Sequence, residues 1–112
     1  MGFRGEGAQQ TMTMPIAKDI LKKCEEVSQA LKILAHPDRL RILCRLLDGK
    51  ATVGEITEFC DISQSATSQF LARMKTEGLL SSEREGSYVY YSISDRRLIQ
   101  LLRAIRDSYC AT

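Results

Sequence analysis

Apolar residues recur at helical spacing in three stretches of the chain. In residues 15–34, which open at Pro15, a favourable first-turn residue, they form one stripe with Cys24 at its edge: Ile16, Ile20, Val27, Ala30, Leu31 and Leu34. Residues 37–48 are apolar over about half of the helical circumference, so we expect this helix to be central to the core. A narrower stripe follows a last helix that starts at Ser94 or Asp95: Leu98, Leu101, Leu102, Ile105 and Tyr109.

The segment between the second and the last of these helices carries the end signals of two further helices. Thr52 can cap the first one, Glu55 completes a capping box with it, and the helix ends near Cys60. A three-residue turn leads into the next helix, which Ser63 caps and Gly78 ends. Two helices joined by so short a turn are typical of a helix-turn-helix.

A hairpin follows this pair of helices. The apolar stretches 79–80 and 88–93 flank residues 84–87, which have the composition of a hairpin turn. The sequence therefore predicts a mainly α chain with five helices and a small β-hairpin wing, which is a winged helix-turn-helix. The second helix of the motif has the size to enter a DNA major groove, so DNA binding is the first function to expect.

The helix that follows Ser63 separates into two faces. Its apolar arc should pack on the domain and contains Ala66, Thr67, Phe70, Leu71 and Met74. The opposite face holds side chains suited to base edges, namely Gln64, Ser65, Ser68 and Gln69. Arg73 and Lys75 are better placed for phosphate, and Arg84 in the hairpin turn for the DNA backbone or an adjacent minor groove. Gln and Ser also simply solvate exposed helices, but the hairpin at wing distance favours DNA contact.

Length and composition agree with one domain. A chain of 112 residues holds a single small core, which we assign to residues 15–112 after a flexible tail at 1–14. The 44% of hydrophobic residues excludes a disordered protein, and no apolar run approaches the ~20 residues that span a bilayer. The N-terminus lacks a hydrophobic signal region, so we expect a cytoplasmic protein whose four cysteines are thiols or small hydrophobes.

The charge of the chain is weak evidence for DNA binding. The formal net charge is only +2, so non-specific phosphate binding by one subunit should be modest. Two subunits side by side would double the field, which is a mild argument for a homodimer. The first and last helices each have an apolar side, and we expect them to form the dimer surface.

Several ordered motifs resemble the ArsR/SmtB family of bacterial winged-helix repressors, over roughly residues 30–110. They are residues 36–43 (HPDRLRIL), 53–56 (VGEI), 63–69 (SQSATSQ) and 86–91 (GSYVYY). The resemblance implies a homodimer that binds an inverted repeat in a double-stranded DNA operator and leaves it when an inducer reaches a sensing site. It also implies that the four polar side chains of the outward face contact bases.

The metal-sensing members of this family are a poorer match. Their arsenic and cadmium sensors carry a Cys-x-Cys pair on the first helix of the motif, where this chain has residues 52–54 (TVG). Their zinc and nickel sensors use histidine and carboxylate ligands on the last helix, which here offers Asp95 and Asp107 but no histidine. The single histidine, His36, stands beside a proline and is more often a structural cap than a ligand. We therefore expect no metal site and no cofactor.

Cys44 and Cys110 resemble the thiol pair of the dithiol persulfide- and redox-sensing branch of the family, typified by BigR, SqrR and HlyU. The resemblance implies that persulfides, polysulfides or oxidants act on these thiols. One thiolate attacks an electrophilic sulfur or peroxide, and the second thiol resolves the adduct as a disulfide or a longer sulfur bridge. The reduced form should bind the operator and the bridged form should release it. Cys24 and Cys60 have no counterpart in this pattern, and Cys60 is expected to be exposed and incidentally oxidisable.

Two alternatives remain open. One is a repressor of the same fold that senses a metalloid such as arsenite through Cys24, Cys60 or Cys110 in an arrangement across the dimer. The other is a winged helix that binds proteins and no DNA, which the near-neutral charge of the motif would suit. An enzyme is not expected, because the sequence shows no cluster of acid, base and nucleophile and no phosphate loop.

Overall fold

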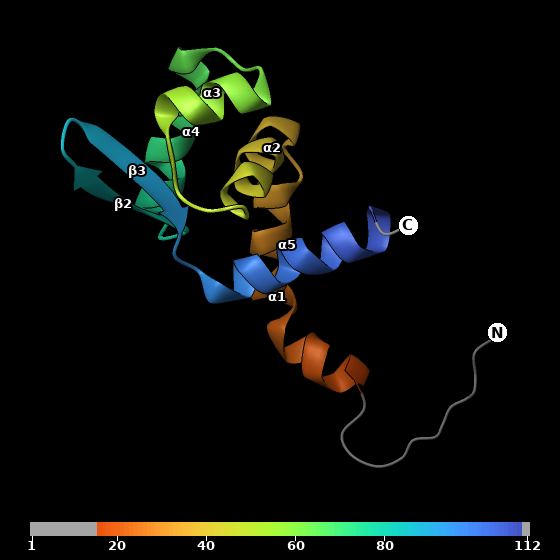
Figure 1. Ribbon diagram of the computed structural model, residues 1–112. Helices are drawn as coiled ribbons and strands as arrows, with labels where there is room; N and C mark the ends of the chain where they lie inside the picture. Colours follow the sequence, from red (N-terminus) through yellow and green to blue (C-terminus); the bar gives the residue numbers. More distant parts are fainter. Residues whose placement is uncertain (1–15, 111–112) are drawn as a thin grey trace. The chain divides into compact units, whose positions relative to one another are not determined.

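The computed structural model describes residues 16–110, which form five helices and a three-stranded sheet (Figure 1). The elements follow in the order α1 (Ile16–Leu34), α2 (Pro37–Leu46), β1 (Ala51–Thr52), α3 (Val53–Cys60), α4 (Gln64–Thr76), β2 (Leu80–Glu85), β3 (Tyr88–Ile93) and α5 (Arg96–Tyr109). The winged helix-turn-helix predicted from the sequence is confirmed. The expected tail at 1–14 and the helix start at Pro15 lie outside the described residues.

The chain divides into two units, residues 1–32 and residues 33–112. The described part of the first unit is most of α1, whose large apolar side chains are exposed to solvent: Ile16, Ile20, Leu21, Val27 and Leu31. The second unit contains the other elements and the core. No helix within the described range is long and apolar enough to cross a membrane.

The core of the second unit lies around α2, as its wide apolar arc predicts. Ile42, Leu43 and Leu46 are buried on this helix. They belong to a cluster of buried apolar side chains against which Tyr91 and Ile93 of β3 pack: Leu34, Ala51, Ile56, Cys60, Leu71, Met74, Leu79, Leu80, Leu98 and Leu102. Because burial of each large aliphatic side chain contributes roughly 1.5–3 kcal/mol, this cluster fixes the positions of α4 and the wing.

The helix starts of α2, α3 and α4 follow the capping signals in the sequence. The Nδ1 atom of His36 accepts the backbone N–H of Asp38 at 3.2 Å, which makes this histidine the structural cap of α2. Thr52 and Glu55 form the predicted capping box at α3. The Oγ of Ser63 accepts the backbone N–H of Ala66 at 3.1 Å and caps α4.

The wing is longer than the sequence pattern indicated. Antiparallel β2 and β3 pair up to Glu85 opposite Tyr88, so the hairpin turn contains only Gly86 and Ser87 and not the predicted residues 84–87. Gly86 has a φ of 65°, which a two-residue hairpin turn requires at this position. Strand β1 was not predicted, because two residues carry no alternating pattern; it pairs with β3 and completes the strand order β1-β3-β2.

Candidate nucleic-acid interface and thiol site

The outward face of α4 is polar and exposed, as predicted. Gln64, Ser65, Ser68 and Gln69 are all exposed, whereas Thr67, Leu71 and Met74 of the opposite face are fully buried. The first turn of α4 contains no acidic residue, so the partial positive charge of the helix N-terminus is not offset there. A helix end of this kind favours an anion such as a DNA phosphate beside the exposed glutamines and serines.

The two cations of α4 are already engaged within the protein. Nε of Arg73 lies 3.9 Å from a carboxylate oxygen of Glu77 on the same helix. Nζ of Lys75 donates to Oγ of Ser82 at 2.6 Å, which connects α4 to strand β2 of the wing. Arg73 is highly exposed, and an exposed ion pair at this distance contributes little free energy, so it can turn to phosphate at small cost.

Arg84 lies on strand β2 and not in the hairpin turn, because the strands pair beyond it. It stands opposite Val89 and its side chain is exposed near the tip of the wing. Lys50 forms an ion pair with Glu85 and lies 5.1 Å above the ring of Tyr90. Sequence reasoning missed Lys50, because its partners are distant along the chain. These contacts connect the residue before β1 to strands β2 and β3.

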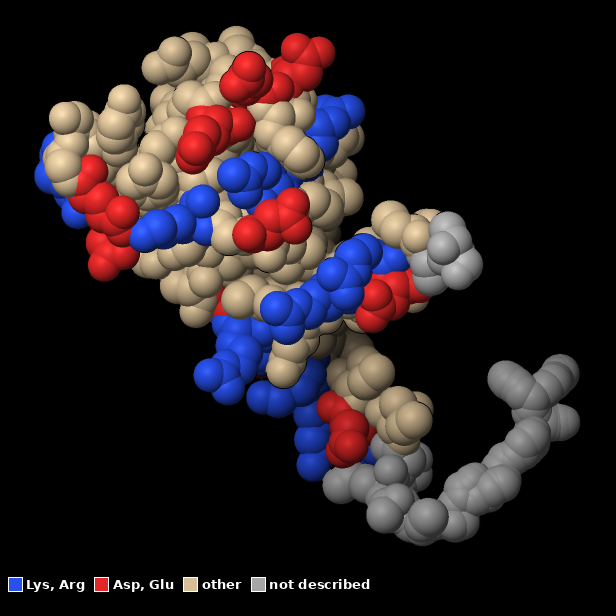
Figure 2. All heavy atoms as spheres, viewed as in Figure 1, with Lys and Arg blue, Asp and Glu red and all other residues tan. Residues whose placement is uncertain are grey.

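Charged side chains do not gather into one patch on the visible face of the molecule. In Figure 2, blue Lys and Arg groups lie among red Asp and Glu groups on the second unit. This mixture agrees with the small net charge of the chain. With a net charge of only +2, non-specific phosphate binding by one chain should be modest.

Cys44 lies on α2 with its side chain exposed, and Cys110 is the exposed C-cap residue of α5. The surrounding protein partly desolvates Cys44, which raises the pKa of its thiol, and the charge of Cys110 raises that pKa further. The two thiols are thus within electrostatic range of each other although they are far apart in the sequence. All four cysteines of the chain are free thiols.

Cys60 is buried, so the expectation that it is exposed was wrong. It is 7% exposed and belongs to the core cluster, because it follows Ile56 by one helical turn and faces the same way. Burial raises the pKa of Cys60, while the positive charge of Arg41 lowers it and the charge of Cys44 raises it. The spacing of four residues between Ile56 and Cys60 was the sequence signal that could have predicted the burial of Cys60. Cys24 on α1 is exposed.

The described residues contain no group of three or more His, Cys, Asp or Glu side chains arranged to hold a metal ion. His36 uses its Nδ1 atom as a cap, and Asp95 accepts the backbone N–H groups of Arg97 and Leu98 at the start of α5. His36 and Asp95 therefore have structural roles at helix starts, whereas Asp107, near the end of α5, forms an ion pair with Arg106.

The sequence pattern of the arsR family of bacterial regulatory proteins matches residues 36–82. The HTH-type transcriptional regulator YgaV of Escherichia coli is 40% identical over 87 residues, which are 77% of this chain and 88% of that protein. The match therefore extends beyond the helix-turn-helix to most of the chain.

Solved structures agree with these sequence relationships. The transcriptional repressor BigR from Xylella fastidiosa superposes with a TM-score of 0.79 at 32% identity, over 90% of this chain and all of that chain. A homodimeric winged helix-turn-helix DNA-binding domain from Mycobacterium bovis superposes with a TM-score of 0.66 at 26% identity, over 88% of this chain and 89% of that domain.

Proposed function

This chain belongs to the arsR family of bacterial regulatory proteins and is a DNA-binding transcriptional regulator, and we propose that it is a dimeric repressor switched by two thiols. The reduced dimer binds an inverted repeat in its operator. A bridge between Cys44 and Cys110, formed by persulfide, polysulfide or oxidant, releases the DNA. The observation that supports this proposal is that both thiols are free and exposed, one on a core helix and one at the end of α5. That the charge of Cys110 raises the pKa of Cys44 agrees with it.

The DNA contacts come from α4 and the wing. Gln64, Ser65, Ser68 and Gln69 are exposed on one face and carry the donors and acceptors that base edges in a major groove require. Arg73, Lys75 and Arg84 contact phosphate, where they fix the register of the helix on the duplex. The uncompensated N-terminus of α4 supports this orientation.

Dimerisation accounts for apolar surface that one chain leaves uncovered. Ile16 and Leu21 on α1 are 77% and 72% exposed, and Tyr109 on α5 is 87% exposed. Exposed apolar side chains on two helices are typical of a surface that a second copy covers. The homodimeric state of the domain from Mycobacterium bovis supports the same assembly, and a twofold dimer presents two α4 helices to the two half-sites of an inverted repeat.

The bridging step oxidises two thiols and reduces the inducer. One thiolate attacks a sulfur of a polysulfide or an oxygen of a peroxide, and hydrosulfide or hydroxide leaves with the electron pair. The second thiolate then attacks a sulfur of the adduct and displaces hydrosulfide or hydroxide from it, so that a disulfide or a longer sulfur bridge forms. A disulfide needs Cα atoms within about 7 Å, whereas a bridge of several sulfurs spans more. The separation of Cys44 and Cys110 therefore selects the kind of inducer.

A bridge couples the thiols to DNA through the position of α2. It ties this core helix to α5, which contributes to the proposed dimer surface, and shifts the spacing of the two α4 helices. Because both half-sites are contacted together, a small shift weakens both contacts. Coupling of this type is usually worth about 1–3 kcal/mol, which corresponds to roughly 5- to 150-fold in operator affinity.

Operator affinity before and after polysulfide treatment tests the proposal. The operator is first selected from a pool of random duplexes with the reduced protein. We expect the treated wild-type protein to lose affinity, whereas treated Cys44→Ser and Cys110→Ser retain it. Cys24→Ser, which removes an exposed thiol outside the pair, should respond like the wild type. Full loss of binding in either treated single variant of the pair refutes the mechanism.

A further inference from the structure

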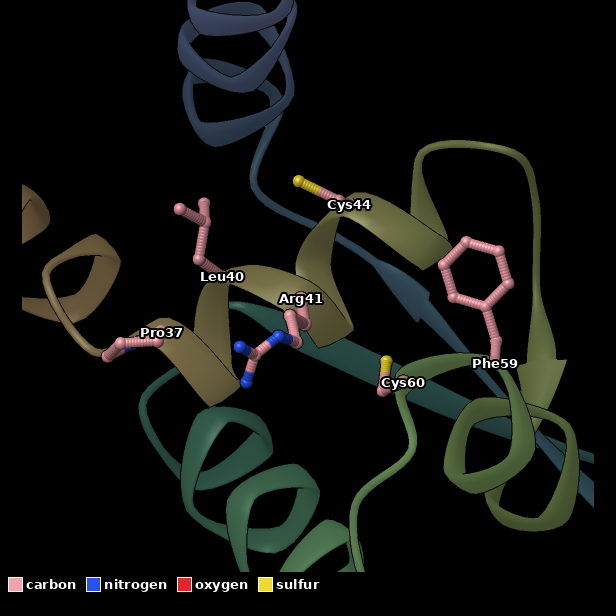
Figure 3. A pocket seen from close by; sticks show the side chains of 6 residues that line it. All are labelled: Pro37, Leu40, Arg41, Cys44, Phe59 and Cys60. Atoms are coloured by element: carbon pink, nitrogen blue, oxygen red, sulfur yellow. The ribbon is translucent and has the colours of Figure 1, made fainter.

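A hollow on the second unit lies between α2 and the end of α3, beside Cys44 (Figure 3). Its volume is about 510 Å³, within the range of small-molecule sites. The side chains that line it are Pro37, Leu40, Arg41, Cys44, Phe59 and Cys60. Three of these six are apolar and two are cysteines, so the hollow combines an apolar surface with two thiols.

Phe59, the aromatic side chain that lines the hollow, is exposed to solvent. Phe59 is 63% exposed and lies at the end of α3, whereas its neighbour Cys60 is buried in the core. The phenyl ring lies at one end of the hollow, and Pro37 and Leu40 lie at the other (Figure 3). A ligand that enters the hollow therefore finds apolar contact at both ends.

The charged side chain that lines the hollow is Arg41. Nη1 of Arg41 forms an ion pair with Asp38 at 2.5 Å, and this pair lies on the exposed side of α2. The guanidinium of Arg45 lies 5.9 Å above the Phe59 ring, and its Nη1 donates to the carbonyl oxygen of Gly49. Burial is the largest cause and raises the pKa of Cys60, as do the charges of Cys44 and Asp38, whereas both arginines lower it. Because the pair of Arg41 with Asp38 is exposed and such pairs contribute little free energy, Arg41 can contact a bound carboxylate at small cost.

We propose that this hollow binds a small carboxylate with an apolar body and an electrophilic disulfide, persulfide or peroxide group, and presents that group to Cys44. Phe59, Leu40 and Pro37 hold the apolar body, and Arg41 attracts the carboxylate. The inference rests on the proposed function, because it names the chemical class of the inducer. It makes the site selective for anionic organic electrophiles over neutral ones.

The reaction at Cys44 follows ordinary thiol–disulfide exchange. The Cys44 thiol gives its proton to solvent, and the thiolate attacks one sulfur of the bound disulfide. The sulfur–sulfur bond of the ligand breaks, and the far half leaves as a thiolate with the electron pair. The mixed disulfide on Cys44 is then attacked by the Cys110 thiolate, which releases the second half and leaves the Cys44–Cys110 disulfide.

Two chromogenic disulfides, one dianionic and one neutral, test this site. The dianionic bis(carboxynitrophenyl) disulfide and the neutral dipyridyl disulfide both release a chromophore when a thiol attacks, and peptide mapping locates the modified cysteine. With the wild-type protein, we expect the rate at Cys44 to saturate with the concentration of the anionic probe. A strictly linear dependence for both probes would mean that no complex forms and would overturn the proposal.

Variants of the hollow separate its charge from its apolar wall. Arg41→Gln should slow the anionic probe by about two- to fivefold, the range of an exposed ion pair, and leave the neutral probe unchanged. Arg41→Lys keeps the charge and should restore most of the rate, which excludes a folding defect. Phe59→Ala should slow both probes. Arg96→Gln removes an exposed arginine at the start of α5, outside the hollow, and should change neither rate. An equal effect of Arg41→Gln on both probes contradicts the inference.

Failure of this inference is distinguishable from failure of the proposed function. If the probes react without saturation but the Cys44–Cys110 bridge still releases DNA, the switch stands and the hollow is not its ligand site. If the probes bind selectively but the bridge leaves operator affinity unchanged, the hollow stands and the switch does not.

Discussion

The imidazole of His36 meets the ring of Phe70 edge-on, with 5.0 Å between ring centroids and 62° between ring planes. His36 caps α2, the helix that carries Cys44, and Phe70 lies on α4, the helix that we propose contacts DNA. The contact therefore joins the thiol-bearing helix to α4. A displacement of α2 by a sulfur bridge has a direct physical path to α4 through these two rings.

Substitution of His36 separates its cap from its ring contact. His36→Asn keeps a capping acceptor but removes the ring, so we expect a loss of about 0.5–1.5 kcal/mol in the free energy of unfolding. His36→Ala also removes the cap and should lose about 1 kcal/mol more. Urea denaturation of the reduced proteins measures both values. Equal stability of the Asn and Ala variants would show that the Nδ1 atom does not stabilise α2.

Substitutions on α4 and the wing should separate base contacts from phosphate contacts. Gln69→Ala should cost about 1–3 kcal/mol with the selected operator and relax its preference at one base position. Arg73→Ala should weaken binding to all duplexes alike and reduce the slope of log affinity against log salt by about 1. Fluorescence anisotropy over a salt series measures both effects.

Lys75 needs a separate control because it also bonds Ser82. Ser82→Ala removes the hydrogen bond to the wing and leaves the lysine charge. A loss of DNA affinity found in Lys75→Met but not in Ser82→Ala is therefore due to the lost phosphate contact. If the wild-type protein binds duplex DNA with no measurable salt slope, the assignment of Arg73 and Lys75 to phosphate is wrong.

The sequence predicted features that depend on neighbours a few residues apart. The capping pair Thr52 and Glu55 and the cap Ser63 act over three residues, so the helix starts followed from the local sequence. The two faces of α4 followed from helical periodicity, which Thr67 and Gln69 illustrate, one fully buried and the other exposed.

Features that depend on distant pairing could not be predicted in the same way. Strand β1 exists only because Ala51 pairs with Tyr91, forty positions away (91 − 51 = 40). The ion pair of Lys50 with Glu85 and the hollow beside Cys44 likewise need the packed unit. Arg84 was assigned to the turn because composition marks turn residues but does not count how far two strands pair.

The raised pKa of Cys44 gives its reactivity a defined pH dependence. Because burial and the charge of Cys110 both favour the neutral thiol, alkylation of Cys44 by iodoacetamide should increase through a higher pH range than that of an ordinary cysteine. Cys110→Ser removes the second cause and should move the profile to lower pH, though not fully, since burial is the larger cause. Mass spectrometry of the Cys44 peptide over a pH series measures the profile. An unchanged profile in Cys110→Ser would show that the two thiols do not interact.

Buried Cys60 should respond to substitution as a core residue. Cys60→Ala keeps an apolar side chain and loses only part of its packing, so we expect a destabilisation of roughly 1 kcal/mol. Cys60→Ser is closer in size but brings a hydroxyl into the core, and a buried hydroxyl without a partner costs about 1–3 kcal/mol. Serine should therefore be the more damaging change, and urea denaturation at neutral pH ranks the two variants.

The pH dependence of stability gives an independent check on Cys60. Its pKa in the folded protein is raised above that of the unfolded chain, so its contribution to stability is fully present below the ordinary thiol pKa. That contribution is lost as pH rises through the raised value, because the unfolded chain releases the proton more readily. Cys44 behaves in the same direction, so Cys60→Ala should flatten the alkaline fall in stability without abolishing it. A fall as steep as that of the wild type would place Cys60 in contact with solvent.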